Sequence, residues 1–246
     1  MHQRRPGSHL TVLTGAGLST ASGIPDFRGP QGTWTQHPEQ ADLLEIDRHV
    51  NDMAIRMAGW AMWQDHPAWA SAPSDAHRAL VELERAQLLE AVLTQNFDGL
   101  HHAAGHSPEL VVELHGGMRT TSCLRCGARQ ATTAVLARLE RDRDPGCLEC
   151  GGVLKPDVVY FGEWLPEQAL GRAVAAAQDA DVFLVIGSTL TVQPVASLTE
   201  VAADAGAEVV IVNAEPTPYD HLASRVVREP IESAVPELVR ELIARG

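Results

Sequence analysis

The chain has 246 residues, enough for one large domain, or for a large domain with a small insertion, with a full hydrophobic core. A hydrophobic content of 45% and a charged content of 21% are ordinary for a soluble globular protein, and no apolar stretch approaches the roughly 18 residues of a membrane span. The formal net charge of −13 disfavours a general nucleic-acid binder, because affinity for the phosphate backbone depends largely on clustered Lys and Arg.

The excess of negative charge is compatible with a cationic substrate, such as a Lys-rich protein segment. An acidic surface that only keeps the protein soluble explains it as well. The first seven residues include Arg4 and Arg5 but no apolar run of signal-peptide length. We therefore expect no export signal, no membrane partner and a cytoplasmic location.

Five short runs of β-branched and aliphatic residues each end abruptly in a small or polar cluster. These runs are residues 10–13, 91–93, 110–114, 182–186 and 209–212. They are typical of strands buried on both faces of a mainly parallel sheet. Helix-length amphipathic stretches lie between them, at residues 76–90 and 167–177. The alternation of strands and helices predicts an α/β fold with a doubly wound parallel sheet.

The polar clusters lie at residues 14–17, 94–96, 115–117, 187–188 and 213, directly after the predicted strands. In a doubly wound fold, ligands bind at the carboxyl ends of the strands. Any single cluster is explained equally well as a turn, because Gly, Asn and Ser are common turn residues. Five such clusters together favour a binding site.

Residues 118–155 break this pattern, since they contain all four cysteines and no clear buried strand. The cysteines form two C-x-x-C pairs with 20 residues between them, a spacing that can supply a tetrahedral zinc site: Cys123 and Cys126, then Cys147 and Cys150. Gly127 and Gly151 follow the pairs and permit tight turns around a metal. Disulfide bonds are the alternative, which a reducing cytoplasm disfavours. Four thiolates leave no open position for water, so the zinc should be structural.

We therefore expect a small zinc-binding module over residues 118–155. It would be inserted into a large domain formed by residues 1–117 and 156–246.

Gly15, Ala16 and Gly17 follow the first predicted strand and resemble the start of a dinucleotide-binding fingerprint, in which glycines let the backbone approach a pyrophosphate. Thr20 stands where the third glycine of G-x-G-x-x-G would be. The signal is weak by itself, and it disfavours a hydride-transferring dehydrogenase.

The sequence GAGLSTASGIPDFRG, at residues 15–29, resembles the sirtuin family. Further blocks match in the family's order at residues 94–101, 115–116, both cysteine pairs, 155–163, 187–190 and 212–213, so the resemblance extends over nearly the whole chain. It implies a Rossmann-like NAD-binding domain and a small zinc domain, with NAD and an acyl-lysine peptide meeting in the cleft between them.

The resemblance also implies which residues bind NAD. Those of the cofactor-binding loop are Gly15, Ala16, Gly17, Ser19, Asp26, Phe27 and Arg28. Gln95, Asn96 and Asp98 lie around nicotinamide and its ribose. The adenosine-side contacts are Gly187, Ser188 and Asn213, and Ile231 lies where the family often contacts adenine.

The residue types allow other roles beside these. Asn96 and Asp98 can hydrogen-bond a carboxamide or a ribose hydroxyl, but they can also form an Asx turn. Phe27 could shield a reactive sugar cation from water or belong to the core. Glu215 follows Asn213 and no Arg lies nearby in the sequence, which favours the ribose 2′-hydroxyl of NAD over the 2′-phosphate of NADP.

The family's reaction implies that the acyl oxygen of a modified lysine attacks C1′ of the nicotinamide ribose and releases nicotinamide. The ribose 2′-hydroxyl then attacks the intermediate, and this step suits an imidazole base that titrates near neutrality. His115 is the candidate among eleven histidines, since it follows an apolar strand, precedes two glycines and matches the family's catalytic histidine. His101 and His102 are the nearest rivals, and we expect them to support the fold.

The expected activity is NAD-dependent removal of acyl groups, above all acetyl, from protein lysines, giving nicotinamide, free lysine and O-acyl-ADP-ribose. Strand addition would hold the substrate between residues 159–163 and 187–192. The resemblance also bears on the acyl group, because sirtuins that remove succinyl or malonyl groups have a Tyr and an Arg three residues apart on the helix after the cofactor loop. The region 53–63 offers Arg56 but no Tyr, which disfavours these acidic groups. ADP-ribosyl transfer to a protein, NAD hydrolysis and a non-enzymatic role in NAD sensing or zinc-stabilised binding are the alternatives.

Overall fold

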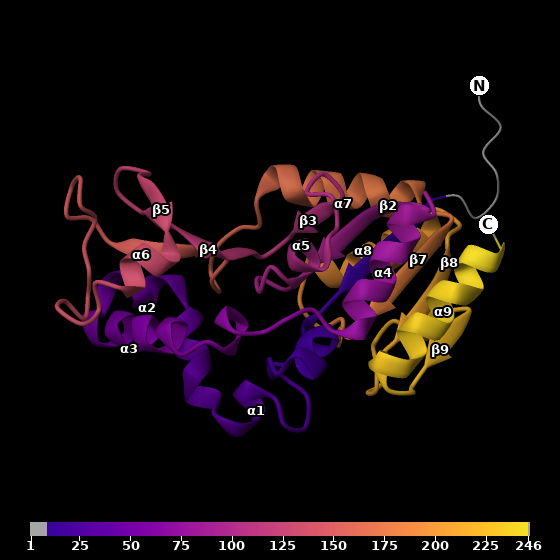
Figure 1. Ribbon diagram of the computed structural model, residues 1–246, viewed down its shortest axis with the longest axis horizontal. Helices are drawn as coiled ribbons and strands as arrows, with labels where there is room; N and C mark the ends of the chain where they lie inside the picture. Colours follow the sequence, from indigo (N-terminus) through magenta and orange to yellow (C-terminus); the bar gives the residue numbers. More distant parts are fainter. Residues whose placement is uncertain (1–8, 246) are drawn as a thin grey trace.

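The computed structural model describes residues 9–245 of the chain; residues 1–7, where the sequence predicts no export signal, lie outside that range. A large α/β lobe stands beside a smaller lobe along the long axis of the molecule (Figure 1). Among residues 9–245 no helix is long and apolar enough to cross a bilayer.

Parallel strands form the central sheet of the large lobe, in the order β3-β2-β1-β7-β8-β9. All five predicted strands belong to it. Their bounds, with those of the added β9, are Leu10–Thr14 (β1), Leu89–Thr94 (β2), Val111–Glu113 (β3), Val182–Ile186 (β7), Glu208–Val212 (β8) and Arg225–Val227 (β9). The central strands are buried throughout, as their aliphatic sequences predict.

Helices cover both faces of this sheet (Figure 1). On one face, α4 (Asp75–Arg85) and α9 (Ile231–Arg245) pack on residues such as Val12 and Leu184. On the other, α7 (Glu167–Asp179) and α8 (Leu198–Asp204) pack on Leu13 and Val185. Successive side chains of each strand therefore enter opposite cores. The fold is doubly wound, as the sequence predicts.

The sheet has a topological switch point between β1 and β7. From β1 the chain extends the sheet on one side through β2 and β3, and it later returns to the other side of β1 with β7. Connections at such a point leave toward opposite faces, so a crevice opens at the strand ends. Gly15 and Gly187 begin the two diverging loops.

The predicted helix 76–90 is too long at its carboxyl end. Helix α4 ends at Arg85, Gln87 adopts a positive φ of 60°, and β2 begins at Leu89. The amide of Leu88 donates to the carbonyl of Leu83 at 3.0 Å and so closes the last turn of the helix. The apolar spacing of the helix thus continues into the first residues of the strand and hides the boundary.

The smaller lobe contains an antiparallel sheet of order β5-β4-β6, made of Gly116–Cys123 (β4), Arg129–Ala131 (β5) and Leu154–Val158 (β6). Helix α6 (Thr132–Leu136) follows β5. Helices α2 (Ile46–Asn51) and α3 (Met53–Gln64) come from an earlier part of the chain, and Trp60 and Trp63 share a core with Val135 and Leu154. The exact limits of the zinc module, residues 118–155, stay a prediction.

Short elements complete the description. They are α1 (Thr33–Gln36), α5 (Leu100–Ala104) and the 3₁₀ turns Ala16–Ser22, Pro38–Leu44, Pro67–Trp69, Val195–Ser197 and Asp220–Leu222.

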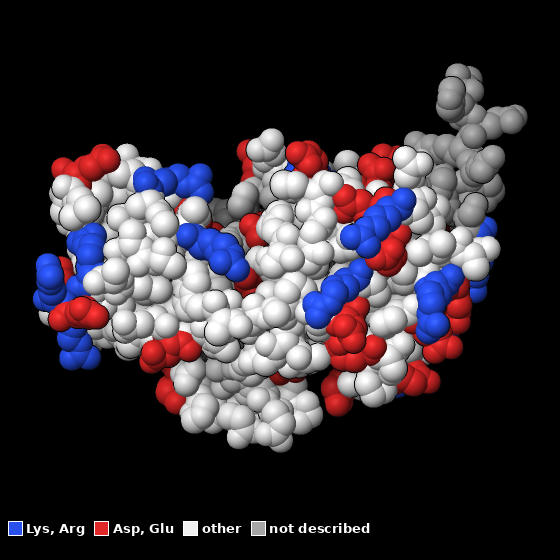
Figure 2. Space-filling model, viewed as in Figure 1, with Lys and Arg blue, Asp and Glu red and all other residues white. Residues whose placement is uncertain are grey.

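Charged side chains of both signs are interspersed over the large lobe on the face drawn in Figure 2. Several form ion pairs across or along the helices, such as Arg85 with Glu82 and Arg225 with Glu241. This mixed face offers no broad basic patch of the kind that nucleic-acid binders use.

Candidate active site

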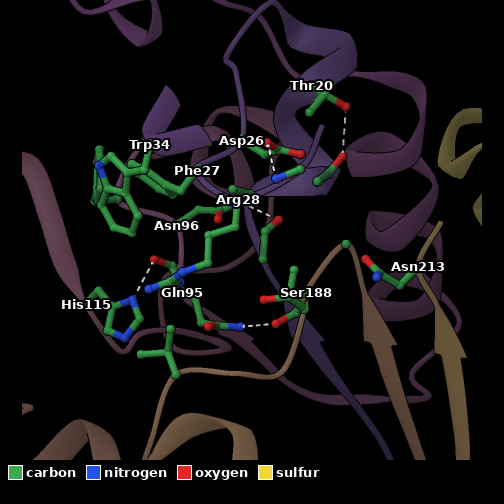
Figure 3. Close-up of a pocket in the computed structure, with 18 of the residues that line it drawn as sticks. Thr20, Asp26, Phe27, Arg28, Trp34, Gln95, Asn96, His115, Ser188 and Asn213 are labelled. Carbon is green, nitrogen blue, oxygen red and sulfur yellow. Dashed lines mark hydrogen bonds between the residues drawn. The ribbon is translucent and has the colours of Figure 1, made fainter. Parts of the chain in front are cut away.

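A cavity of about 580 Å³ lies at the switch point of the large sheet, beside the smaller lobe. Loops that leave β1, β2, β3, β7 and β8 contribute to its walls (Figure 3). The structure brings the following predicted site residues together there: Gly15, Ala16, Gly17, Asp26, Phe27, Arg28, Gln95, Asn96, His115, Gly187, Ser188, Asn213 and Ile231. The five polar clusters after the predicted strands thus meet in one place.

Ser19 and Asp98 line a second, adjoining cavity of about 340 Å³. Ala16, Phe27 and Asn96 line both cavities and therefore stand between them. The second cavity is largely apolar, with Leu44 and Met62 among its walls.

The loop after β1 lies directly against the loop after β7. The amide of Gly15 donates to the carbonyl of Ile186, and that of Gly17 donates to Gly187, each at 2.9 Å. A Cβ atom on Gly187 would lie 2.5 Å from the amide nitrogen of Leu18, and one on Gly15 would lie 2.6 Å from the carbonyl oxygen of Gly187. Glycine is required on both sides of this contact, because the two backbones leave no room for a side chain.

Hydrogen bonds fix the polar residues after β2. Asn96 donates from Nδ2 to the carbonyl of Gly15 at 3.1 Å, and Gln95 donates from Nε2 to Ser188 Oγ at 2.8 Å (Figure 3). These bonds tie the β2 end to the loops after β1 and β7. The site is therefore held in place before any ligand binds.

Asp98 is engaged on both carboxylate oxygens. Oδ1 accepts from the amide of Leu100 at 2.8 Å, which is an Asx turn, and Oδ2 accepts from Ser19 Oγ at 2.7 Å. Burial raises the pKa of Asp98, although these bonds oppose the shift. The turn interpretation of Asp98 is thus correct, and its bond to Ser19 also anchors the loop after β1.

His115 projects into the cavity from the turn between β3 and β4 (Figure 3). Its Nδ1 atom lies 3.0 Å from the carbonyl oxygen of Gln95. Burial lowers the pKa of His115, the bond to Gln95 raises it, and the charge of Arg28 lowers it further. The net shift is downward, so the ring is neutral and able to accept a proton at neutral pH.

The rival histidines have other partners. His101 is buried and bonds Thr14 Oγ1 through Nε2 at 2.9 Å, and His102 lies 3.7 Å from Glu113. Neither is among the described residues that line the two cavities. His101 is thus part of the buried core, whereas the expectation that exposed His102 supports the fold stays a prediction.

Aromatic side chains form the wall between the two cavities. Phe27 and Trp34 have ring centroids 4.5 Å apart, and the Arg28 guanidinium lies over Trp34 at 4.9 Å (Figure 3). Sequence reasoning missed Trp34, which lies in α1 outside every matched block. An aromatic residue shortly after the cofactor loop is a signal that could have indicated it.

The adenosine side corrects one premise drawn from the sequence. No Arg is close to Asn213 in sequence, but Arg228 donates from Nη1 to the Asn213 carbonyl at 2.7 Å and pairs through Nη2 with Asp220. Arg228 is thus neutralised by Asp220 and is not among the described residues that line the cavity. Because Arg228 is paired and the carboxylate of Glu215 lines the cavity, the site still favours the 2′-hydroxyl of NAD over the 2′-phosphate of NADP.

The four cysteines gather in the smaller lobe, at the end of β4 and in the segment that leads to β6. Their sulfur atoms all lie within 4.8 Å of one another, with Cys123 and Cys150 at 3.5 Å and Cys126 and Cys147 at 3.7 Å. Four sulfurs about 2.3 Å from one zinc ion would be separated by about 3.8 Å, so the cluster fits tetrahedral zinc. No disulfide joins them.

Each cysteine pair turns as the glycines predict. Gly127 has a φ of 74° and donates to the Cys123 carbonyl at 2.9 Å; Gly151 has a φ of 69° and donates to the Cys147 carbonyl at 2.8 Å. The two turns repeat the same backbone geometry, as expected for two metal knuckles.

Fold and site together define a dinucleotide-binding α/β protein with a structural zinc module. The family model described as "Sir2 family" matches residues 15–194. The chain is 50% identical, over 234 residues, to NAD-dependent protein deacetylase 2 of Streptomyces coelicolor. The matched region covers 95% of this chain and 97% of that protein. The chain therefore belongs to the Sir2 family, the sirtuins.

Two solved structures are similar over 97% of this chain and 93% of theirs. One, with a TM-score of 0.84 and 35% identity, contains Sir2 with a p53 peptide and NAD+. The other, with a TM-score of 0.86 and 34% identity, contains a Sir2 variant with a deacetylated p53 peptide and 3′-O-acetyl ADP ribose.

Proposed function

We propose that this chain is an NAD-dependent protein-lysine deacetylase in which His115 is the general base. The observation that supports this most strongly is a single cavity that contains both the glycine-rich loop after β1 and the neutral imidazole of His115. A dinucleotide site that has no base would serve binding alone, whereas this site holds a base where the substrate would react.

The residues around the cavity fit NAD. The close contact of Gly15 and Gly17 with Gly187 presents bare backbone, which can approach a pyrophosphate. Asn213 and Ser188 lie at the β8 and β7 ends, where the adenosine half would bind. When bound, NAD supplies the ribose carbon that accepts the acyl oxygen, a nicotinamide leaving group and the 2′-hydroxyl that receives the acyl group.

His115 is held in the tautomer that a base requires. The Gln95 carbonyl can only accept, so the ring proton lies on Nδ1 and Nε2 keeps a free lone pair. We propose that Nε2 takes the proton from a ribose hydroxyl. Phe27, at the wall between the two cavities, would exclude water from the reacting carbon.

The acyl-lysine peptide would add as a strand between residues 159–163 and residues 187–192. Both segments line the cavity, through Val159 to Glu163 on one side and through Ser188, Thr189 and Val192 on the other. Because strand addition reads mainly backbone groups, this mode suits many protein substrates.

An acetyl group suits this site better than an acidic acyl group. Arg56, the arginine of α3, donates from Nε and Nη2 to Asp144 at 2.7 and 2.6 Å, and from Nη1 to the carbonyl of His49 at 2.9 Å. Its charge is therefore committed to the smaller lobe. An acyl carboxylate would find no unpaired partner in Arg56.

We further propose that the protein works in the cytoplasm. Four free thiols arranged for zinc are consistent with a reducing compartment.

Product analysis tests the proposed activity. An acetyl-lysine peptide incubated with NAD and this protein should yield nicotinamide, free lysine and O-acetyl-ADP-ribose in equal amounts. Free ADP-ribose without peptide deacetylation would indicate NAD hydrolysis. Attachment of ADP-ribose from labelled NAD to a protein would indicate ADP-ribosyl transfer. Acetyl removal that proceeds at the full rate without NAD would contradict the proposal.

A further inference from the structure

The indole of Trp164 is 95% exposed, the highest exposure among the large apolar side chains that are exposed in the described residues. It lies in the loop between β6 and α7, residues 159–166. Exposure of a whole indole to water costs free energy, because about 25 cal/mol is lost for each Å² of apolar surface left unburied. Single exposed apolar side chains are common on protein surfaces, so exposure alone does not mark a binding element, but Trp is among the residues that most often dominate binding interfaces.

The loop that carries Trp164 is fixed at its base. The amide of Val159 donates to the carbonyl of His115 at 2.8 Å, and that of Phe161 donates to Leu44 at 2.8 Å. The amide of Ile46 donates back to the Phe161 carbonyl at 3.0 Å. The loop is thus bonded to the catalytic turn on one side and to the smaller lobe on the other.

Glu163, the residue before Trp164, fixes the loop further. Its Oε2 atom accepts from the amide of Tyr160 at 2.7 Å and lies 2.9 Å from Lys155 Nζ, while its own amide donates to the Tyr160 carbonyl at 3.0 Å. The Tyr160 hydroxyl in turn accepts from Trp63 Nε1 at 2.9 Å in the core. Trp164 therefore projects from a preorganised support, which lowers the entropic cost of binding a partner there.

The position of Trp164 relates it to the substrate segment. Both of its chain neighbours, Glu163 and Leu165, line the cavity. Phe161, two residues before Glu163, also lines it, is 43% exposed and has its ring 5.3 Å from that of Trp34. Exposed aromatic surface thus lies at the mouth of the cavity, on the segment proposed to pair with the peptide.

We propose that Trp164 binds a large apolar side chain close to the acetyl-lysine of the substrate peptide and so sets a sequence preference. The inference rests on the proposed deacetylase function. Backbone pairing is indifferent to sequence, so a side-chain contact beside it supplies the selectivity. An apolar partner fits better than a cationic one, because the neighbouring carboxylate of Glu163 is already occupied by Lys155 and the Tyr160 amide.

A peptide library tests this inference. Each of the three positions on either side of acetyl-lysine is set in turn to Ala, Leu, Phe, Arg or Asp, and kcat and KM are measured for the wild type and for Trp164→Ala. At one or two positions the wild type should prefer Phe and Leu over Ala by about three- to tenfold in kcat/KM, through KM. Trp164→Ala should abolish this ratio, and Trp164→Phe should restore most of it.

Met53→Ala provides the matched control, since Met53 is 60% exposed at the start of α3 and is not among the described residues lining either cavity. This variant should keep the wild-type ratio. A ratio that survives Trp164→Ala, or a preference for Arg or Asp that Trp164→Ala removes, would overturn the inference. Absence of NAD-dependent deacetylation with every peptide would instead contradict the proposed function itself.

Discussion

The Nδ1 atom of His115 lies 3.0 Å from the backbone carbonyl oxygen of Gln95. This contact joins the end of β2 to the turn after β3, and it assigns the ring proton to Nδ1. A backbone acceptor cannot change its charge, so the orientation of the imidazole does not depend on the titration of a partner. The free Nε2 atom of His115 is then the basic atom in the cavity.

The rate of deacetylation should depend on pH through His115. Because burial lowers the pKa of His115, the neutral base persists below the ordinary value of 6.5, and protonation removes activity only at more acid pH. A profile of kcat/KM should therefore show an acid limb centred below pH 6.5. A limb centred above pH 7, or no limb down to pH 4, would contradict this role.

Glu113 provides a control for that profile, since burial and the charge of Asp98 raise its pKa to about 7. Its carboxylate lies near His102 and outside the described lining of both cavities. The acid limb of Glu113→Gln should remain where it is in the wild type.

Substitution of Gly187 should separate cofactor binding from backbone strain. Gly187→Ala places a side chain at a φ of 63° and 2.5 Å from the Leu18 amide, so it displaces the cofactor loop. Gly206→Ala is the matched control, because its φ is 94° and its Cβ would meet open space. Gly206→Ala should lose about 1–2 kcal/mol of unfolding free energy from left-handed strain alone, measured by urea denaturation, and Gly187→Ala should lose more because its Cβ also meets the backbone of Gly17 and Leu18. Calorimetry should show a loss of NAD affinity, tenfold or more, for Gly187→Ala alone.

The cysteine cluster should carry about one tightly bound zinc ion per chain. Cys147→Ser should lose the metal and unfold β4 to β6, because structural zinc binding contributes directly to the folding free energy. Leu148→Ala, at an exposed position between Cys147 and Cys150, should keep both. Elemental analysis and circular dichroism check this, and an intact, zinc-free wild type would refute the assignment.

Much of this architecture was predictable, because strands buried on both faces leave an unmistakable apolar signal. Strand β9 was missed for the opposite reason, since Arg225 and Val226 are exposed at the edge of the sheet. The end of α4 was missed because Leu83 and Leu89 are both buried, so the sequence remains apolar across the boundary. The hydrophobic pattern of the sequence predicts which residues are buried, but it does not predict where a helix ends and a strand begins.

The site residues after the strands were predictable because fold topology brings strand ends together. Arg228 was not predictable, since its contact with Asn213 is formed only in space, and for Trp34 the sequence offered only its position shortly after residues 15–29 and not its contact with Phe27. The packing of α3 on the zinc-bearing lobe, through Trp60 and Trp63, is likewise a tertiary contact. Phe27 lines both cavities, whereas Ser19 lines only the smaller of the two. This difference also depends on three-dimensional packing.

A cluster of three buried histidines, His77, His101 and His106, should make the fold sensitive to acid. The ring centroids of His77 and His101 are 5.2 Å apart, and those of His101 and His106 are 5.7 Å apart. Burial lowers the pKa of His77 to about 4 and lowers those of His101 and His106 as well. The unfolded chain therefore binds more protons than the folded one, and stability is complete above pH 6.5 and is lost as the pH falls toward 4.

The slope of unfolding free energy against pH measures this effect. His101→Gln, which can keep the bond to Thr14 but cannot titrate, should reduce the slope between pH 6.5 and 5 by up to about 1.4 kcal/mol per pH unit. His37→Gln, which alters an exposed histidine outside this cluster, is the matched control. Equal slopes in the wild type and His101→Gln would argue against the cluster as the source.

The most direct test of the role of His115 is to measure three quantities together for His115→Ala: NAD affinity, the rate of net deacetylation and the rate of nicotinamide exchange. NAD affinity should stay within about threefold of the wild type, since the contacts are spread over the loops after β1, β2, β7 and β8. Net deacetylation should fall by about 10² to 10⁴, the usual contribution of a positioned base, while exchange of labelled nicotinamide should fall less, because the base acts after nicotinamide leaves. A His115→Ala variant that deacetylates near the wild-type rate would remove His115 from the mechanism.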